Sequence, residues 1–282
     1  MKLIKAIQNP RLAGLVLEHK AVAAIDKWFP ATEEQLISVL PFTRNSRRLL
    51  ALKDRHQGER CFIIGTGPSL LVEDLDRLVN EITFASNKIF LAFDQTRWRP
   101  TYYSVFDILV AQQNKKQIKE LELNKIMSLP MLPSLDQSEV IWVYTRATEE
   151  QVDKPTAHFS TNLLRGLYGG RTVIIAQLQL AYYMGIREVY LLGVDFHFNI
   201  SKPTGEESMH GLVLESQGEK NHFHPEYRKA GEKWTIPRLD HQYKAFGRAK
   251  TAFEKQGGTI YNASRQTALD LFPRIDFEAI VF

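Results

Sequence analysis

Short apolar runs recur along the chain from residue 61 onwards, and each has the length of a buried β-strand. They cover residues 61–64, 82–85, 102–106, 140–144, 188–193 and 259–261. The run at 188–193, which reads Glu-Val-Tyr-Leu-Leu-Gly, is the clearest, and Gly65 ends the first run abruptly. We therefore expect a strand at each of these positions.

Helical patterns separate the strands. Ser69 is placed to cap a helix that contains Leu70, Leu71, Leu75 and Leu78. Further helices are expected at 112–123, 172–184, 240–255 and 267–271, and Gly185 is placed to end the second of these. Strands that alternate with helices predict an α/β fold of the Rossmann-like type, with a mostly parallel sheet and helices on both faces. In such sheets ligands bind beyond the carboxyl ends of the strands.

Two segments fall outside this alternation. Residues 1–57 have a helical pattern interrupted by Pro30 and Pro41, which predicts a helical N-terminal extension to a main domain at 58–282. Within that domain, residues 196–237 contain many polar and aromatic residues without a clear period. A stretch of this kind is typical of a lid or active-site loop.

Composition narrows the class of protein. Of the 282 residues, 44% are hydrophobic and 24% are charged, as in an ordinary globular protein. The single cysteine, Cys61, excludes an intrachain disulfide and suits a reducing compartment. The N-terminus is too polar for a signal peptide, and no apolar run approaches the ~18 residues of a membrane helix, so we expect a cytoplasmic protein without a transmembrane segment.

The charge balance bears on the partners. The net charge is +4 and the basic residues are scattered. A nucleic-acid-binding protein would usually concentrate them in a stripe with interleaved aromatic residues. A mild basic excess suits an enzyme that handles anionic nucleotides, so we expect no nucleic-acid partner.

The segment Gly65-Thr66-Gly67-Pro68-Ser69 joins the first expected strand to the first expected helix. Glycines allow a tight turn and a close approach by a ligand, and the N–H groups at a helix start favour phosphate. The segment is neither a Walker P-loop nor the full dinucleotide fingerprint, because no Gly-Lys-Ser/Thr follows and Pro68 and Ser69 interrupt the G-x-G-x-x-G pattern. Contact with a phosphate or nucleotide is favoured over the alternative of a plain tight turn.

Polar residues also follow other strands. Asn87 and Asp107 come after the second and third, where the ligand crevice is expected. An asparagine there can bind a base or a sugar hydroxyl, and an aspartate can bind a ribose, a metal or a substrate amine; both would also serve as helix caps. Asp195 and His197 follow the strand at 188–193 as a candidate active-site pair, with a structural role for Asp195 as the alternative.

Two further clusters are candidates. Gly169, Gly170 and Arg171 precede the apolar helix and form a second possible anion or sugar site, or a merely conformational loop. In the expected lid, His222 and His224 offer a general base, because free histidine titrates near neutrality. The His-x-His spacing is weak evidence for a metal site, because no cysteine accompanies it. The alternative is that both histidines are exposed loop residues without a function.

Taken in order, the motifs are CFIIGTGPSL, ASNKIF, SVFD, a glycine-rich helix start, GIREVYLLGVDFHF and a histidine-containing lid. This series resembles the bacterial sialyltransferases, which use CMP-sialic acid to build cell-surface glycans. It also resembles the broader MptE-like family, which includes 6-hydroxymethylpterin diphosphokinases and motility-associated glycosyltransferases. The resemblance covers residues 58–275, and GTGPSL and GVDFHF are its most specific blocks.

The resemblance to sialyltransferases implies one Rossmann-like domain with a smaller lid and an inverting transfer that needs no metal. It implies that residues 65–69 and Asn87 contact the nucleotide. It also implies that a lid histidine, here His224 or His222, deprotonates the acceptor hydroxyl. Tyrosines of the family stabilise the leaving phosphate, and a role of that kind falls here to His197 and Tyr227.

The chain departs from the family pattern at three positions. The family has asparagine where Thr66 and Asp107 stand, and tyrosine where His197 stands. An anionic Asp107 near a nucleotide phosphate is unfavourable without a cation, which leaves room for a metal at that point.

We therefore predict a nucleotide-binding catalytic domain at 58–282 that moves a sugar from a nucleotide-activated donor, with a CMP-sugar favoured, to a cell-surface glycan acceptor. No cofactor is required and no metal site is expected. Catalytic roles are assigned to His224, His222 and Asp195. Nucleotide binding is assigned to Gly65, Thr66, Gly67, Pro68, Ser69, Asn87, Asp107, Gly169, Gly170 and Arg171.

Two alternatives remain open at this stage. An MptE-like diphosphokinase would transfer diphosphate from ATP to a pterin and would use Mg²⁺ at Asp107 and Asp195. A nucleotide-binding scaffold would bind without catalysis. Residues 1–57 are candidates for homo-oligomerisation or for peripheral docking at the inner membrane, and the sequence does not decide between these roles.

Overall fold

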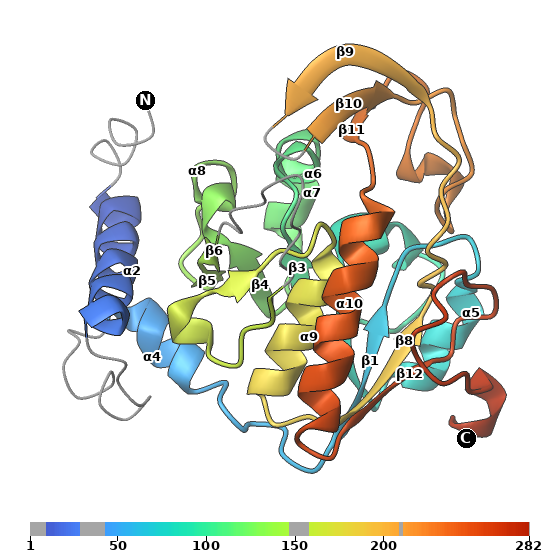
Figure 1. The fold of residues 1–282 in the computed structure, drawn as a ribbon. Coiled ribbons are helices and arrows are strands. Elements are labelled where there is room, and N and C mark those ends of the chain that lie inside the picture. The colour runs from blue at the N-terminus through green and yellow to red at the C-terminus, as the bar shows by residue number, and fades with distance from the viewer. Residues whose placement is uncertain (1–9, 29–42, 147–157, 209–210, 282) are drawn as a thin grey trace.

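A parallel sheet of seven strands forms the centre of the molecule (Figure 1). The structure is a computed structural model that describes residues 10–28, 43–146, 158–208 and 211–281. The strand order is β12-β8-β1-β2-β3-β4-β5, and every neighbouring pair is parallel. The bounds are Arg60–Ile64 for β1, Ile82–Ser86 for β2, Tyr102–Val105 for β3, Lys125–Ser128 for β4, Ile141–Val143 for β5, Glu188–Leu192 for β8 and Thr259–Asn262 for β12.

The strand order reverses between β1 and β8. The chain runs outward from β1 to β5 and then returns to place β8 and β12 on the other side of β1. In α/β sheets the crevice at such a reversal, outside the carboxyl ends of the strands, is where ligands bind. The fold is therefore the Rossmann-like α/β sheet that the sequence predicts, and it directs the search for a site to the end of β1.

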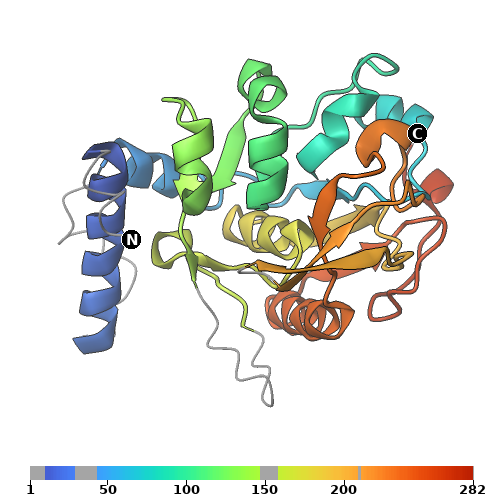
Figure 2. The same ribbon diagram turned by 90° about the horizontal axis from the view of Figure 1, so that it is seen from above.

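Helices cover both faces of this sheet (Figure 2). α9 and α10 lie on one face and α5 to α8 on the other, and each side forms its own buried cluster with the strands. The α-helices are α2 Pro10–Trp28, α4 Arg44–Leu50, α5 Val72–Leu75, α6 Ile108–Gln113, α7 Lys115–Glu120, α8 Leu132–Leu135, α9 Val173–Tyr183 and α10 Leu239–Glu254. The 3₁₀ helices are η1 Asp76–Leu78, η2 Asn87–Ala92, η3 Leu129–Met131, η4 Leu163–Arg165, η5 Pro225–Tyr227 and η6 Phe277–Ala279.

Burial on both faces explains why the strands are apolar runs and not alternating patterns. In β1, Cys61 and Ile63 pack with α9, while Phe62 and Ile64 pack on the opposite face, and all four are fully buried. The six predicted strands are all present. The sequence analysis missed β4, which begins with Lys125, a buried lysine that donates to the Lys119 carbonyl at 3.1 Å.

Three helix predictions were wrong in part. Ser69 does not cap a helix, because α5 begins at Val72 with Leu71 as its N-cap. Residues 112–123 contain not one helix but α7 and the end of α6, with a break at Asn114. Residues 267–271 form no helix, since the Thr267 hydroxyl donates to the Val194 carbonyl at 2.7 Å and ties this segment to the end of β8.

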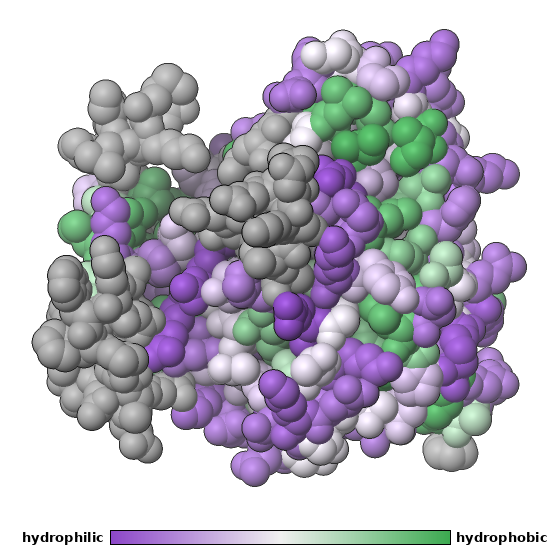
Figure 3. Space-filling model, in the orientation of Figure 1, coloured by the Kyte–Doolittle hydropathy of each residue, from purple (hydrophilic) through white to green (hydrophobic). Residues whose placement is uncertain are grey.

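The expected lid contains a small antiparallel sheet beyond the carboxyl ends of the main strands (Figure 1). Its strands are β9 Lys202–Ser208, β10 Gly211–Glu215 and β11 Lys233–Thr235. In Figure 3 apolar surface gathers at the upper right, over this small sheet, while much of the remaining described surface in that view is polar. A two-stranded sheet of β6 Thr145–Arg146 and β7 Leu167–Tyr168 lies near the start of α9.

The described residues of the N-terminal segment include the helices α2 and α4, followed by turns at 51–58. Residues 1–9, Pro30 and Pro41 lie outside the described residues. α2 packs on the body through the buried side chain of Leu15. In the described ranges, no helix is both long and apolar enough to cross a membrane.

Candidate functional site

The turn after β1 packs directly against the turn after β8. The Gly65 N–H donates to the Leu192 carbonyl at 2.7 Å, and the Gly67 N–H donates to the Gly193 carbonyl at 2.9 Å. A Cβ atom at Gly65 would lie 2.3 Å from the Gly193 oxygen, and one at Gly67 would lie 2.6 Å from the Asp195 carboxyl group. The two glycines are therefore required by the contact between these turns.

Asp195 stabilises this contact between the two turns through hydrogen bonds to Ser69. Its carboxylate accepts a 2.9 Å hydrogen bond from the Ser69 N–H and a second one from the Ser69 hydroxyl. Burial raises the pKa of Asp195, although both bonds and the nearby His197 oppose the rise. The geometry is that of the structural alternative for Asp195, whereas His197 is exposed.

The N–H groups of the turn are mostly committed to the fold. Besides Gly65, Gly67 and Ser69, the Leu70 N–H donates to the Gly67 carbonyl at 3.1 Å. Thr66 is the residue of the turn whose N–H makes no hydrogen bond to the described residues. The expected row of N–H groups at a helix start is therefore not what this turn presents to a ligand.

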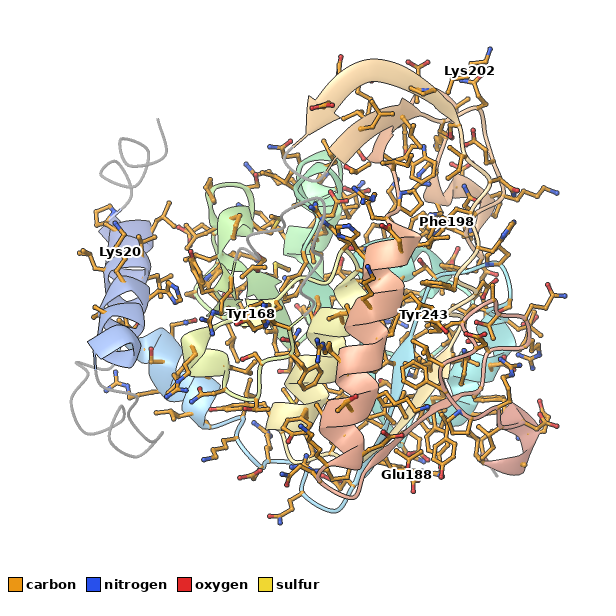
Figure 4. The ribbon with its side chains drawn as sticks, viewed as in Figure 1. Lys20, Tyr168, Glu188, Phe198, Lys202 and Tyr243 are labelled. Atoms are coloured by element: carbon orange, nitrogen blue, oxygen red, sulfur yellow. The ribbon has the colours of Figure 1, made fainter. Side chains whose placement is uncertain are left out.

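The segment expected to be a lid contacts Thr66. The Thr66 carbonyl accepts from the Phe223 N–H at 3.0 Å and from the His222 Nδ1 at 3.2 Å. The Thr66 hydroxyl donates to the Tyr227 oxygen at 3.3 Å. The structure thus brings the glycine turn and the predicted lid residues together. Figure 4 shows Phe198, near the start of the lid, between the small sheet and α10.

His222 is held as a neutral ring. Its Nδ1–H donates to the Thr66 carbonyl, so Nε2 has the lone pair, and Nε2 is buried without a hydrogen-bond partner among the described residues. The ring stacks on Tyr227 at a centroid distance of 3.7 Å. Burial, reinforced by the charges of Arg228 and Lys88, lowers the pKa of His222 to about 3.

His224 has the opposite arrangement. Its Nδ1 accepts a 3.1 Å hydrogen bond from the Glu226 N–H and so caps η5. In the neutral ring the proton is then on Nε2. The His222 Nε2 is buried, whereas no ring nitrogen of His224 is buried without a partner, and we take His224 as the more accessible of the two histidines.

Asn87 and Asp107 reach the same region from the main sheet. Asn87, at a positive φ of 53°, follows β2, and its side-chain oxygen is buried without a partner in the described part of the chain. The Asn87 carbonyl accepts from the Tyr103 hydroxyl at 2.6 Å. The Asp107 carboxylate caps α6 by accepting from the Leu109 N–H at 2.7 Å, which is the helix-cap alternative.

The sequence did not lead us to expect two positively charged side chains of this site, those of Lys88 and Arg228. Lys88, directly after Asn87, is buried and pairs with Glu232 at 3.0 Å. Arg228, directly after Tyr227, lies 4.0 Å from the centre of the Trp234 ring. Both residues follow a predicted site residue directly, which is the one sequence feature that could have indicated a role in the site. A lysine or arginine on the surface of a polar segment looks the same in the sequence.

Arg228 lies in a partly buried environment close to several charged groups. Burial lowers the pKa of Arg228, and Tyr227, followed by the carboxylates of Glu219, Glu232 and Asp107, counters this effect. The Arg228 Nη1 is buried and has no hydrogen-bond partner in the described ranges. Among the described residues, no group of three or more His, Cys, Asp or Glu side chains is placed to share a metal ion.

The second glycine loop lies at the start of α9. Gly170 and Arg171 have positive φ angles of 55° and 61°, and a Cβ atom at Gly170 would lie 2.7 Å from the Ile175 side chain. The Thr172 hydroxyl caps α9, and the Arg171 carbonyl accepts from Gln242 of α10 at 3.1 Å. Because α9 runs back into β8, this loop, including Gly169, lies at the carboxyl edge of the sheet.

No family model matches the sequence, and no curated protein matches it. Among solved structures, the MAf glycosyltransferase from Magnetospirillum magneticum AMB-1 is similar, with a TM-score of 0.50 and 15% identity over 87% of this chain and 40% of that one. The sialyltransferase CstII from Campylobacter jejuni, in complex with the substrate analogue CMP-3FNeuAc, has a TM-score of 0.43 and 14% identity over 77% of this chain and 86% of that one. At these identities the first likeness establishes a shared fold, and the chain spans two fifths of that protein's length.

Proposed function

We propose that this chain is a glycosyltransferase that moves a sugar from a nucleotide-activated donor to a hydroxyl of a glycan acceptor. One observation carries the proposal. Three buried polar atoms lack partners among the described residues, and their residues all neighbour Tyr227: Asn87 Oδ1, His222 Nε2 and Arg228 Nη1. Buried polar groups are nearly always paired, so three orphans in one place indicate a polar ligand. They also stand at the sheet edge where α/β proteins bind nucleotides.

The residues present support a direct displacement. The donor nucleotide would lie against Thr66 and Asn87, and His224 would take the proton of the acceptor hydroxyl. The acceptor oxygen then bonds to the anomeric carbon as the bond from that carbon to the phosphate oxygen breaks, which inverts the configuration. The nucleotide departs with the electron pair, and the Tyr227 hydroxyl stabilises its phosphate.

His224 suits the role of base better than His222. A general base is most effective with a pKa near the working pH, and burial has lowered the pKa of His222 to about 3. The lone pair of His224 is on Nδ1, which caps η5. His224 must therefore release the Glu226 N–H when it accepts the proton, which couples the proton transfer to a local movement of η5.

The charges favour a donor with a single phosphate. Lys88 is paired with Glu232, so of these two cations Arg228 is the one left for a phosphate, and little positive charge remains for a second phosphate. A nucleoside monophosphate link has one negative charge and a diphosphate link has two. This supports a CMP-linked sugar, with sialic acid or a related acidic sugar as the group transferred.

The diphosphokinase alternative finds less support. It needs Mg²⁺, for which Asp107 and Asp195 were the candidate ligands. Ser69 engages both oxygens of Asp195, and the first turn of α6 engages one oxygen of Asp107. The Asp195 carboxylate therefore has no oxygen without a hydrogen bond to offer a cation, and Asp107 has one.

The test is turnover of a sugar nucleotide in EDTA. The purified chain is incubated with CMP-sialic acid and with UDP- and GDP-sugars, and nucleotide release is followed by chromatography with and without an oligosaccharide acceptor. We expect release of CMP, and we expect His224→Gln to slow it by about 10²–10⁴-fold while CMP still binds. Binding without turnover of any donor would identify a scaffold, and turnover of ATP that depends on Mg²⁺ would identify the diphosphokinase.

A further inference from the structure

We infer that Arg228 binds the phosphate of the nucleotide, and that Trp234 orients its guanidinium group for this purpose. The inference rests on the proposed function, because it concerns the nucleotide of that reaction. It assigns a phosphate-binding charge to the expected lid, in place of the N–H groups of the glycine turn, most of which already donate hydrogen bonds within the fold.

The small sheet holds the guanidinium group. Arg228 stacks on Trp234 of β11 at 4.0 Å, and the Trp234 Nε1–H donates to the Ser201 hydroxyl at 3.0 Å. Trp234 is itself paired with Leu214 in the ladder between β10 and β11. Stacking uses the flat face of a guanidinium group and leaves the N–H donors at its edge available for a planar, bidentate contact.

Those donors lack an acceptor. Nη1 is buried without a hydrogen-bond partner, and none of the ion pairs in the described part of the chain includes Arg228. The neighbouring cations differ, because Lys88 pairs with Glu232 and Lys229 pairs with Glu226. A buried charged donor without an acceptor is costly, and a phosphate oxygen is the acceptor that suits it.

Asp107 does not pair with Arg228. Its carboxylate accepts from the N–H groups at the start of α6, and no ion pair joins it to Arg228 in the described ranges. A structural salt bridge would have satisfied Nη1. The orphaned donor, with Asn87 Oδ1 and His222 Nε2 around the same tyrosine, instead leaves Arg228 facing the place where the nucleotide is proposed to lie.

The experiment compares nucleotides with their nucleosides. Affinities of the full chain for CMP and cytidine, and for UMP and uridine, are measured by calorimetry at one fixed salt concentration. The variants are Arg228→Met, Arg228→Lys and, as a matched control of equal charge change, Lys229→Met. Lys229 is exposed and lies one residue further along. Thermal melting without ligand checks that each variant folds. If Arg228→Met does not fold, the comparison is made with Arg228→Lys.

We expect Arg228→Met to weaken binding of the preferred nucleotide by about ten- to one hundred-fold while the affinity for its nucleoside stays unchanged. Arg228→Lys should lose part of that affinity, and Lys229→Met should lose none. Three results would overturn the inference: equal losses for nucleotide and nucleoside, no loss for either Arg228 variant, or a wild-type chain that binds no nucleotide more tightly than its nucleoside. If the proposed function fails instead, no sugar is transferred but the effect of Arg228 on phosphate binding persists.

Discussion

At the scale of single residues, the glycines after β1 are fixed by their neighbours across the turn. Gly65 and Gly67 touch the chain between Gly193 and Asp195, where a side chain has no room. The sequence pattern indicated small residues between a strand and a helix, and it led us to expect a ligand as the reason. The reason in the structure is another turn, and a single sequence does not reveal which segment approaches a glycine.

Gly65→Ala should therefore lower the stability of the folded chain even when no ligand is present. The new methyl group would meet the Gly193 carbonyl, and we expect a loss of about 1–3 kcal/mol, seen as a lower melting temperature. Gly247→Ala is the control, because Gly247 lies inside α10 and a Cβ atom added there would meet nothing within 4 Å. It should gain about 0.5–1 kcal/mol from helix propensity. Equal effects of the two substitutions would contradict this account of the turn.

The buried His222 should make stability depend on pH. The unfolded chain takes up a proton on this residue below pH 6.5, whereas the folded chain does so only near pH 3. The contribution of His222 to the free energy of unfolding should thus be fully present above pH 6.5 and fall as the pH drops towards 3. At pH 5 the loss from this residue should be about 2 kcal/mol. His222→Asn keeps an N–H donor for Thr66 and should flatten the dependence. Denaturant unfolding at pH 5 and pH 7 measures it, and an unchanged slope in the variant would refute the burial of a neutral ring.

At the scale of elements, α2 depends on a few contacts with the body of the protein. Leu15 is 8% exposed, while Leu17, two residues on, is 66% exposed. The Glu18 carboxylate accepts from the Thr43 N–H at 3.2 Å and from the Thr43 hydroxyl at 2.8 Å, so it joins α2 to the start of α4. These contacts indicate that α2 can open independently of the sheet.

Leu15→Ala and Leu17→Ala form a matched pair for this element. Removing the buried leucine should cost about 2 kcal/mol or more and lower the hydrogen-exchange protection of α2 by about 30-fold, whereas the exposed one should change protection little. Protection of β1 and β8 should stay the same in both variants. Loss of protection in those strands with Leu15→Ala would show that α2 and the sheet unfold together.

The elements differ in how well their sequences predict them. β1 and β8 are buried on both faces, so their apolar runs reveal them. β9 carries mostly polar, exposed side chains and has no apolar period, so only pairing with β10 identifies it as a strand. The sequence does not predict β4 for a related reason. Lys125 breaks the apolar run, and a lysine is expected to be exposed, but in the fold its ammonium group is buried and hydrogen-bonded.

At the scale of the whole molecule, the site is assembled from segments far apart in the chain. Thr66 comes from the turn after β1, Asn87 and Asp107 follow β2 and β3, and the lid adds His222 to Arg228. Sequence order predicted the strand-end residues because parallel strands end at one edge of the sheet. It did not predict Arg228, whose importance depends on where the lid folds.

The most direct test of the central claim is whether this assembled site binds a nucleotide without a metal. Thermal melting is measured with CMP, UDP, GDP, ADP and ATP, each with Mg²⁺ and each with EDTA. A ligand at ~100 times its dissociation constant stabilises the folded chain by roughly 2.7 kcal/mol, which is a shift of several degrees. We predict that CMP raises the melting temperature equally in EDTA and in Mg²⁺. Stabilisation by ATP alone, and only with Mg²⁺, would contradict the claim.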